Sequence, residues 1–210
     1  MSRASDHPRS RHPYTASRKL LDAFAAFDIL AYIVTESREF PGTDLTFKLY
    51  SLVILGIMIA FWLALRRHEY PVWAVVSLQL TVMGHIAGRF VVVDGQPLYR
   101  SHILGLRGDK VIHALNAAAA AIFTTALFRR LKFDHGGWEG FIVVMTVSGA
   151  GALVEIVEYG GTMVLPAHYV GDYANNMQDL VANLLGALLG WMGVRLMLRE
   201  DTPTVSRSGS

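Results

Sequence analysis

The sequence predicts an all-α fold, a polytopic bundle of about six transmembrane helices. Only 17% of its 210 residues are charged, whereas a soluble domain carries about 25%. The mean hydropathy is +0.35, and 52% of the residues are hydrophobic. The uncharged residues are gathered in long runs, and a helix needs about 20 mostly apolar residues to cross about 30 Å of hydrocarbon. These observations together predict a membrane protein.

Three runs contain no Asp, Glu, Lys or Arg, and each predicts one membrane-spanning helix. They cover residues 49–65, 71–88 and 111–128. Two further runs, residues 140–165 and 179–198, are interrupted by charge only near their ends. The weakest run, residues 20–35, is short and holds Asp22 and Asp28. It is either a tilted span or an interfacial helix, and we count it as a span.

Lysine and arginine are concentrated on one side of these predicted spans. Thirteen of the 19 Lys and Arg residues fall on the side of the two termini, and six fall on the other. By the positive-inside rule the first side is cytoplasmic. We therefore expect both termini in the cytoplasm, and the loops at residues 94–107 and 166–178 outside. No cleavable signal peptide is expected, because no small-residue cleavage site follows the first apolar run.

A single helical domain accounts for most of the chain. Residues 1–19 and 200–210 are polar and poor in large apolar groups, which predicts two disordered tails around a bundle at residues 20–199. No repeat of fixed period and no linker divides this bundle. Small residues that allow membrane helices to pack closely occur at Gly149-Ala150-Gly151-Ala152 and at Gly186, Gly190 and Gly193.

Ionisable residues lie at one level of the predicted bundle. Such residues are costly inside a span and usually face the bundle interior, so they are the first functional candidates. Four predicted spans carry them in their outer halves, as the pairs His85 and Arg89, Asp109 and His113, Glu155 and Glu158, and Asp179 and Asn183. The members of each pair are three or four residues apart and share one helix face. A loop with His168, Asp172, Asn175 and Asn176 precedes the last span.

These side chains form a donor set for a metal ion or for proton transfer. We expect one pocket whose chemistry is carried by Asp109, His113, Glu155, Glu158 and Asp179. The predicted metal ligands are His113, Glu155, Glu158 and Asp179, with His85 at the edge of the pocket. Because the chain has no Cys, these ligands are oxygen and nitrogen atoms, which suit zinc, iron, manganese or magnesium. Crowded carboxylates also favour a shared proton.

The same residues also have a purely structural interpretation. His85 could form a hydrogen-bonded pair with Arg89. Asp179 could cap the N-terminus of the last helix, since Asp is a preferred N-cap residue. The two glutamates could close a salt-bridge network with Arg89, Arg107 or Lys110. Convergence of the side chains in space would separate these alternatives.

Several classes of function have no support in the sequence. It contains no G-x-x-x-x-G-K-[ST], H-E-x-x-H or G-x-S-x-G motif, which argues against nucleotide hydrolysis, zincin proteolysis and α/β-hydrolase chemistry. The pI near 9.0 arises from the cytoplasmic flanks and tails, where anionic lipid headgroups explain the positive charge. The expected partners are therefore membrane lipids, and no nucleic-acid partner is expected.

The second half of the chain carries several motifs that occur together in a known family. They are Gly108-Asp109-Lys110-Val111-Ile112-His113, Glu155-Ile156-Val157-Glu158, Gly171-Asp172, and Asp179 to Gly190 with Asn183 and Gly186 between them. With His85-Ile86-Ala87-Gly88 and Pro97-Leu98-Tyr99 ahead of these motifs, residues 80–195 resemble the VanZ-like integral membrane proteins, and in particular their YjdF-like relatives. The resemblance implies a bacterial inner-membrane protein linked to the cell envelope. VanZ itself is associated with low-level resistance to the glycopeptide teicoplanin.

The leading functional hypothesis is an outward-facing polar pocket, able to bind a metal ion, that acts on an envelope lipid or a lipid-linked precursor. Two alternatives stay open. One is a transporter that uses the same carboxylates and histidine as a proton or cation relay, and the other is a structural membrane protein without catalysis. Transporters favour ionisable groups near the bilayer midplane and often contain inverted repeats. The outward position of the cluster and the lack of a repeat favour the pocket.

Overall fold

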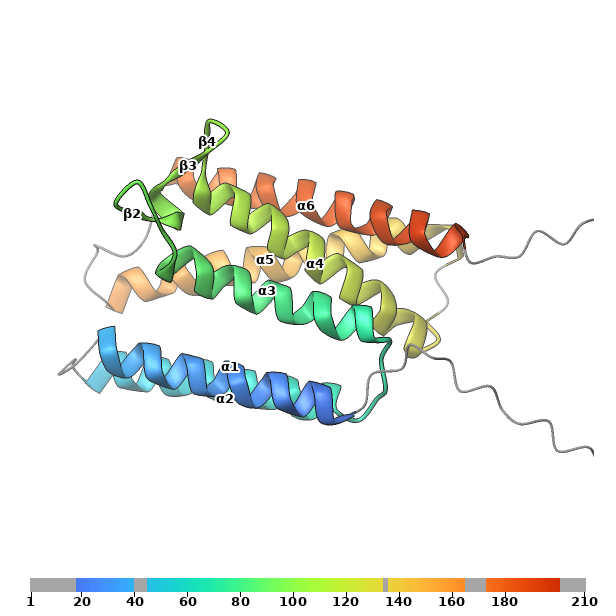
Figure 1. Ribbon diagram of the computed structural model, residues 1–210, viewed down its shortest axis with the longest axis horizontal. Helices are drawn as coiled ribbons and strands as arrows, with labels where there is room; N and C mark the ends of the chain where they lie inside the picture. The colour runs from blue at the N-terminus through green and yellow to red at the C-terminus, as the bar shows by residue number, and fades with distance from the viewer. Residues whose placement is uncertain (1–17, 40–44, 134–135, 165–172, 201–210) are drawn as a thin grey trace, which may run out of the picture.

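Six helices make up the bundle, as the sequence predicts. The computed structural model describes residues 18–39, 45–133, 136–164 and 173–200. The helices are α1 (Arg18–Glu39), α2 (Leu45–Leu65), α3 (Val72–Phe90), α4 (Gly108–Arg130), α5 (Glu139–Val164) and α6 (Tyr173–Glu200). They alternate in direction, so the start of α1 and the end of α6 lie at the same end of the bundle (Figure 1). The predicted tails fall mostly on residues 1–17 and 201–210, outside the described residues.

The length and composition of the helices suit a membrane. The segments Gly108–Arg130, Gly136–Gly160 and Tyr173–Met197 are long and apolar enough to cross one, and Ser51–Leu65 is a shorter apolar segment. Large apolar side chains also cover the outside of the bundle: Leu52, Leu153 and Leu189 are 62%, 63% and 65% exposed. A contiguous apolar exterior is typical of a surface that faces lipid. Whether α1, α2 and α3 cross the membrane stays a prediction.

Two helices are longer than the hydropathy pattern predicts. The α1 helix has 22 residues, about 33 Å at 1.5 Å per residue, which is long enough to span the hydrocarbon. The α6 helix begins at Tyr173, six residues before Asp179. The prediction that residues 173–178 belong to a loop was therefore wrong, because hydropathy does not report the polar first turns of a helix.

The closest helix contact lies between α4 and α6. A Cβ atom added at Gly186 would collide with the carbonyl oxygen of Ala114, and one added at Gly190 would collide with that of Ala118. Both glycines are buried, so the two backbones pack directly against each other, as small residues allow in membranes. A Cβ atom added at Gly193 would meet no atom within 4 Å, so this third glycine does not take part in the contact.

Two short β-hairpins and a helical turn connect α3 to α4. The first hairpin pairs β1 (Val92–Val93) with β2 (Gln96–Pro97), the turn η1 spans Leu98–Arg100, and the second hairpin pairs β3 (His102–Ile103) with β4 (Leu106–Arg107). Both two-residue turns have positive φ at each position, 50° and 75° at Asp94-Gly95 and 52° and 82° at Leu104-Gly105, as type I′ turns require. The sequence predicted only a loop here. The hairpins project from the end of the bundle opposite the start of α1 and the end of α6 (Figure 1).

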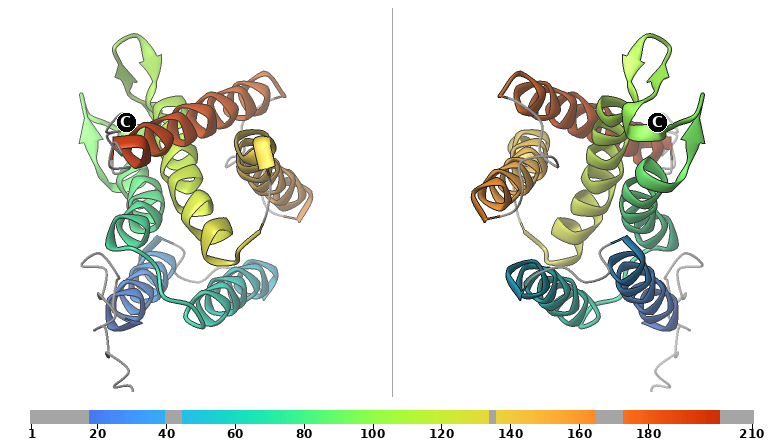
Figure 2. Two further views of the ribbon diagram at one scale, coloured as in Figure 1. Left: turned by 90° about the vertical axis from the view of Figure 1, so that its right-hand side faces the viewer. Right: turned by 90° about the vertical axis from the view of Figure 1, so that its left-hand side faces the viewer.

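The first two helices lie together on one side of the other four (Figure 2). At the end near the termini, Leu21, Leu65 and Tyr70 pack in one apolar cluster with Phe123 and Ala126 of α4. Polar contacts join α1 to its neighbours as well. Asp22 accepts hydrogen bonds from Trp62 at 2.9 Å and Arg66 at 3.1 Å, and Asp28 accepts one from Gln79 at 2.8 Å. Asp22 and Asp28 of α1 therefore point toward other helices.

Candidate functional site

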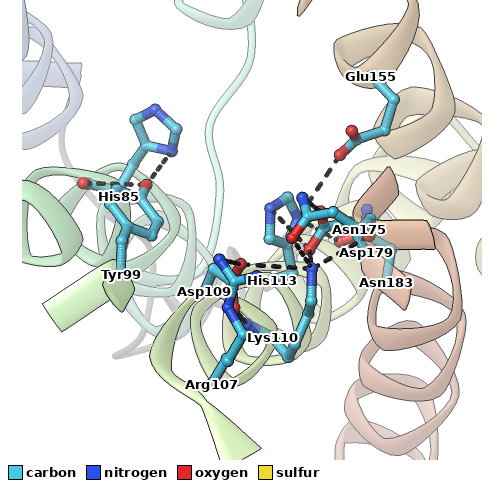
Figure 3. A network of polar contacts seen from close by, with 10 residues as sticks. All are labelled: His85, Tyr99, Arg107, Asp109, Lys110, His113, Glu155, Asn175, Asp179 and Asn183. Atoms are coloured by element: carbon cyan, nitrogen blue, oxygen red, sulfur yellow. Dashed lines mark hydrogen bonds and ion pairs between the residues drawn. The ribbon is translucent and has the colours of Figure 1, made fainter. Parts of the chain in front are cut away.

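Three ionisable side chains from three helices meet at the hairpin end of the bundle. His113 is in the second turn of α4, Glu155 is on α5 and Asp179 is on α6 (Figure 3). One ligand atom from each lies within 4.8 Å of the other two. Glu155 and Asp179 are only 6% and 3% exposed, and His113 is partly buried. The bundle therefore brings together one imidazole and two carboxylates with little access to solvent.

Lys110 is the positive centre of this cluster. Its Nζ atom donates to Oδ1 of Asp179 at 2.7 Å and to Oδ1 of Asn175 at 2.9 Å, and it lies 3.3 Å from Oδ2 of Asp109. Arg107 pairs with the same Asp109 oxygen at 3.0 Å. Nδ2 of Asn175 donates to the other Asp179 oxygen at 2.8 Å. Both oxygens of Asp179 therefore accept a hydrogen bond within this network.

The His113 ring is held by an amide on the facing helix. Its Nδ1 atom lies 3.3 Å from Oδ1 of Asn183, and its Nε2 atom lies 3.5 Å from Oδ1 of Asp179. Gly151 on α5 makes room for that amide, since a Cβ atom there would come within 2.6 Å of Nδ2 of Asn183. Because an amide oxygen accepts, Nδ1 carries the proton and donates to it.

Glu155 has an oxygen with no donor. Its Oε1 atom is buried and has no hydrogen-bond partner among the described residues. The nearest described group that can carry a positive charge is the His113 ring, whose Nδ1 atom is 4.0 Å away. A buried carboxylate oxygen is costly without a hydrogen bond or a cation. This oxygen therefore marks a position where positive charge is missing.

A count of the charges in the cluster also indicates that positive charge is missing. Within the contacts above, three carboxylates (Asp109, Glu155 and Asp179) face two permanent cations (Arg107 and Lys110). At least one further positive charge is needed for neutrality. A proton on His113 or Glu155, or a bound cation, would supply it.

Other predicted site residues lie around this centre. Asp109 contributes through Lys110 and Arg107 rather than by contact with His113. Glu158 lies one turn beyond Glu155 on α5 and is partly buried, with no hydrogen bond or ion pair to a described residue. His168 and Asp172 lie outside the described residues.

These contacts bear on two of the structural interpretations given above, the Asp179 N-cap and the salt-bridge network of the two glutamates. Asp179 is not an N-cap, because α6 has already made six residues when it is reached, and its carboxylate binds Lys110 instead. Arg107 and Lys110 pair with Asp109 and Asp179 rather than with the two glutamates. A salt-bridge network is present, but among the described contacts it leaves Glu155 with only the neighbouring His113 ring.

His85 forms a separate pair with a residue of the connecting turn. The Tyr99 hydroxyl lies 2.9 Å from Nδ1 of His85 and 3.3 Å from its carbonyl oxygen, apart from the cluster around His113 (Figure 3). Burial raises the pKa of the Tyr99 phenol, and the negative charge of Glu158 adds to the effect, so the hydroxyl stays protonated. Gly88 leaves space for the ring, since a Cβ atom there would come within 2.6 Å of it.

We expect Tyr99→Phe to lower the free energy of unfolding by about 1 kcal/mol, the usual net value of one hydrogen bond. Thermal unfolding of the purified protein in detergent measures this. Tyr173→Phe is the control, because the Tyr173 side chain is 77% exposed. If both substitutions have the same effect, the contact with His85 does not stabilise the fold.

The sequence alone singles out Lys110 and Asn175 but does not assign them to each other or to Asp179. Lys110 and Asn175 belong to different helices, and their 2.9 Å contact depends on how α4 and α6 pack. The only signal in the sequence was the position of Lys110 beside Asp109, within three residues of His113. A lysine inside a span needs a buried partner.

The fold and the cluster define a polytopic helical membrane protein with a buried ionic centre near one end. A family model described as "Predicted membrane protein (DUF2238)" matches residues 20–200. The chain therefore belongs to this family of membrane proteins. No curated protein and no solved structure matches the chain.

Proposed function

We propose that this protein is a multi-pass protein of the bacterial inner membrane that acts on a phosphate-bearing envelope lipid or lipid-linked precursor. The observation that carries the proposal is the position of the buried ionic centre, at one end of the bundle rather than at its middle. The narrower VanZ-like and YjdF-like resemblance of residues 80–195 agrees with an envelope role.

The depth of the centre suits a lipid headgroup. His113 lies five residues into α4 and Asp179 six residues into α6, which is about 8–9 Å along each helix axis. The headgroup regions add several ångströms on each side of a hydrocarbon core about 30 Å thick. A substrate group at the membrane surface would therefore reach the centre without crossing the bilayer.

The connection between α3 and α4 provides a surface for such a lipid. Leu104 at the tip of the second hairpin is fully exposed, and Leu106 and Val92 are 59% and 63% exposed. Arg100 and Arg107 on the same connection are also exposed. Apolar side chains beside guanidinium groups are suited to acyl chains beside an anionic headgroup.

One observation favours the alternative of a cation or proton relay. Asp28 lies near the middle of α1 and accepts a hydrogen bond from Gln79, which lies near the middle of α3. An acidic residue at mid-span is a feature of proton pathways. Among the described contacts, however, no chain of acidic residues joins Asp28 to the His113 centre.

Lipid analysis of cells tests the proposal. We expect loss of the protein to change the amount of one phosphate-bearing lipid or lipid-linked precursor several-fold, measured by mass spectrometry of membrane extracts. Wild type should restore the profile and His113→Ala should not. His68→Ala, a substitution of the same kind in the connection between α2 and α3, should restore it.

Two results would contradict the proposed function. One is an unchanged lipid profile in cells that lack the protein. The other is full restoration by His113→Ala at wild-type protein levels. Cation uptake into vesicles containing the purified protein, together with an unchanged lipid profile, would support the relay instead.

A further inference from the structure

We propose that His113, Glu155 and Asp179 bind one divalent transition-metal ion, such as Zn²⁺, with a fourth position left open. The inference deepens the proposed function, on which it rests for its substrate. The geometry behind it is a meeting of one ligand atom from each of three helices, of which the buried Oε1 of Glu155 has no hydrogen-bond donor among the described residues.

The first step is the state of the imidazole. With its Nδ1 proton directed to Asn183, a neutral ring would present the lone pair of Nε2 to Oδ1 of Asp179 at 3.5 Å. Two acceptors that face each other repel unless a cation lies between them. Metal-binding histidines use this arrangement, in which the second ring nitrogen donates to an oxygen that fixes the tautomer.

The second step is the unpartnered carboxylate oxygen. Oε1 of Glu155 is fully buried and has no hydrogen bond among the described residues, and the Glu155 side chain is only 7% exposed. The Glu155 side chain points from α5 toward the His113 ring (Figure 3). Oε1 lies 4.0 Å from Nδ1 of the ring, so the Glu155 carboxylate would have to move toward Nε2 to share a cation with it.

The third step is distance. Ligand atoms about 2.0–2.1 Å from a tetrahedral zinc ion lie about 3.3 Å from one another. The Nε2 to Oδ1 separation of 3.5 Å is already close to this value, and the three ligand atoms lie within 4.8 Å. A small inward movement of Glu155 would complete the set.

The donor set also narrows the choice of ion. An imidazole with two carboxylates suits zinc, iron or manganese, whereas magnesium and calcium prefer oxygen ligands alone. Three protein ligands with one open position are typical of catalytic rather than structural zinc sites. An open position at headgroup depth would accept a phosphate oxygen and polarise it.

Lys110 is a supporting residue in this arrangement. It donates to Oδ1 of Asp179, the oxygen that also faces Nε2 of His113, and Asn175 donates to Oδ2, so both oxygens of the carboxylate are held in place. Each Asp179 oxygen keeps further lone-pair capacity for a metal ion. The Lys110 ammonium also adds positive charge beside the site of an anionic headgroup.

Zinc binding to the purified full chain tests the proposal. The protein is stripped with a chelator in detergent, titrated with Zn²⁺ and desalted, and its metal content is measured by mass spectrometry. We expect close to one ion per chain for wild type. His113→Ala and Glu155→Gln should weaken binding by more than about 100-fold, since even supporting residues of metal sites contribute about 10–100-fold.

Asn183→Ala should weaken Zn²⁺ binding by about 10–100-fold, because Asn183 orients the His113 ring without contacting the ion. Glu139→Gln is the matched control. It is the same substitution on the same helix, at the other end of the bundle, where Glu139 binds Arg129 and Arg195. This variant should bind Zn²⁺ as wild type does.

A second measurement uses the wild type alone, so its result does not depend on whether the variants fold. Co²⁺ at a four-coordinate site of nitrogen and oxygen ligands gives intense visible absorption, and Zn²⁺ should remove it. Less than stoichiometric Zn²⁺ with no Co²⁺ spectrum would overturn the proposal, as would unchanged binding by folded His113→Ala. Stoichiometric Zn²⁺ with an unchanged lipid profile would leave the metal site standing and refute only the proposed substrate.

Discussion

Replacement of Lys110 by methionine is expected to lower the free energy of unfolding by about 3–5 kcal/mol, the usual cost of removing one partner from a buried ion pair. Lys110 is 11% exposed and Asp179 is 4% exposed, and their atoms are 2.7 Å apart. Without the ammonium, the Asp179 carboxylate would stay buried beside Asp109 with too little positive charge. Thermal and denaturant unfolding in detergent measure the loss.

Two further variants make this result interpretable. Lys48→Met removes an exposed lysine of α2 and should change stability by less than about 0.5 kcal/mol. Lys110→Met combined with Asp179→Leu should recover much of the lost stability, because an apolar pair can replace a buried ion pair. The double variant should not bind Zn²⁺, because it lacks the proposed ligand Asp179. If Lys110→Met is as stable as Lys48→Met, the network does not stabilise the fold.

Gly186→Ala is expected to destabilise the bundle by about 1–3 kcal/mol, the range found for overpacked cores. The new methyl group would collide with the carbonyl oxygen of Ala114, an atom that cannot move without its helix. Separation of α4 and α6 would also move His113 away from Asp179. The variant should therefore lose Zn²⁺ affinity together with stability.

Gly193→Ala on the same helix is the control for this prediction. A Cβ atom at position 193 meets nothing within 4 Å, and alanine is a better helix former than glycine. This variant should be as stable as wild type or slightly more stable. Equal losses in the two variants would show that the backbone contact between α4 and α6 contributes little.

The helices could be predicted because each depends on local composition. A run of apolar residues has to form its backbone hydrogen bonds within itself in a membrane, so it becomes a helix. The polar ends carry no such signal. For this reason the sequence placed Asp179 at the start of α6, whereas the structure places it six residues inside the helix.

The candidate site could be predicted in part. Spacing along one helix placed Asp179 and Asn183 on a common face, and both contact His113. The sequence could not show which helices face each other. It therefore could not assign Lys110 to Asp179, Asn183 to His113, or His85 to Tyr99, since each pair joins separate segments.

The three proposed ligands come from the last three helices, and this order has a consequence for how the protein is made. Lys110 is synthesised 69 residues before Asp179, a delay of about 3–14 s at 5–20 residues per second. Asp109 is the cluster carboxylate already present when Lys110 is made, whereas Glu155 follows later in that interval and Asp179 comes last. The neighbouring Asp-Lys pair thus lets α4 enter the bilayer with its charges partly balanced, and the ionic centre closes only when α6 arrives.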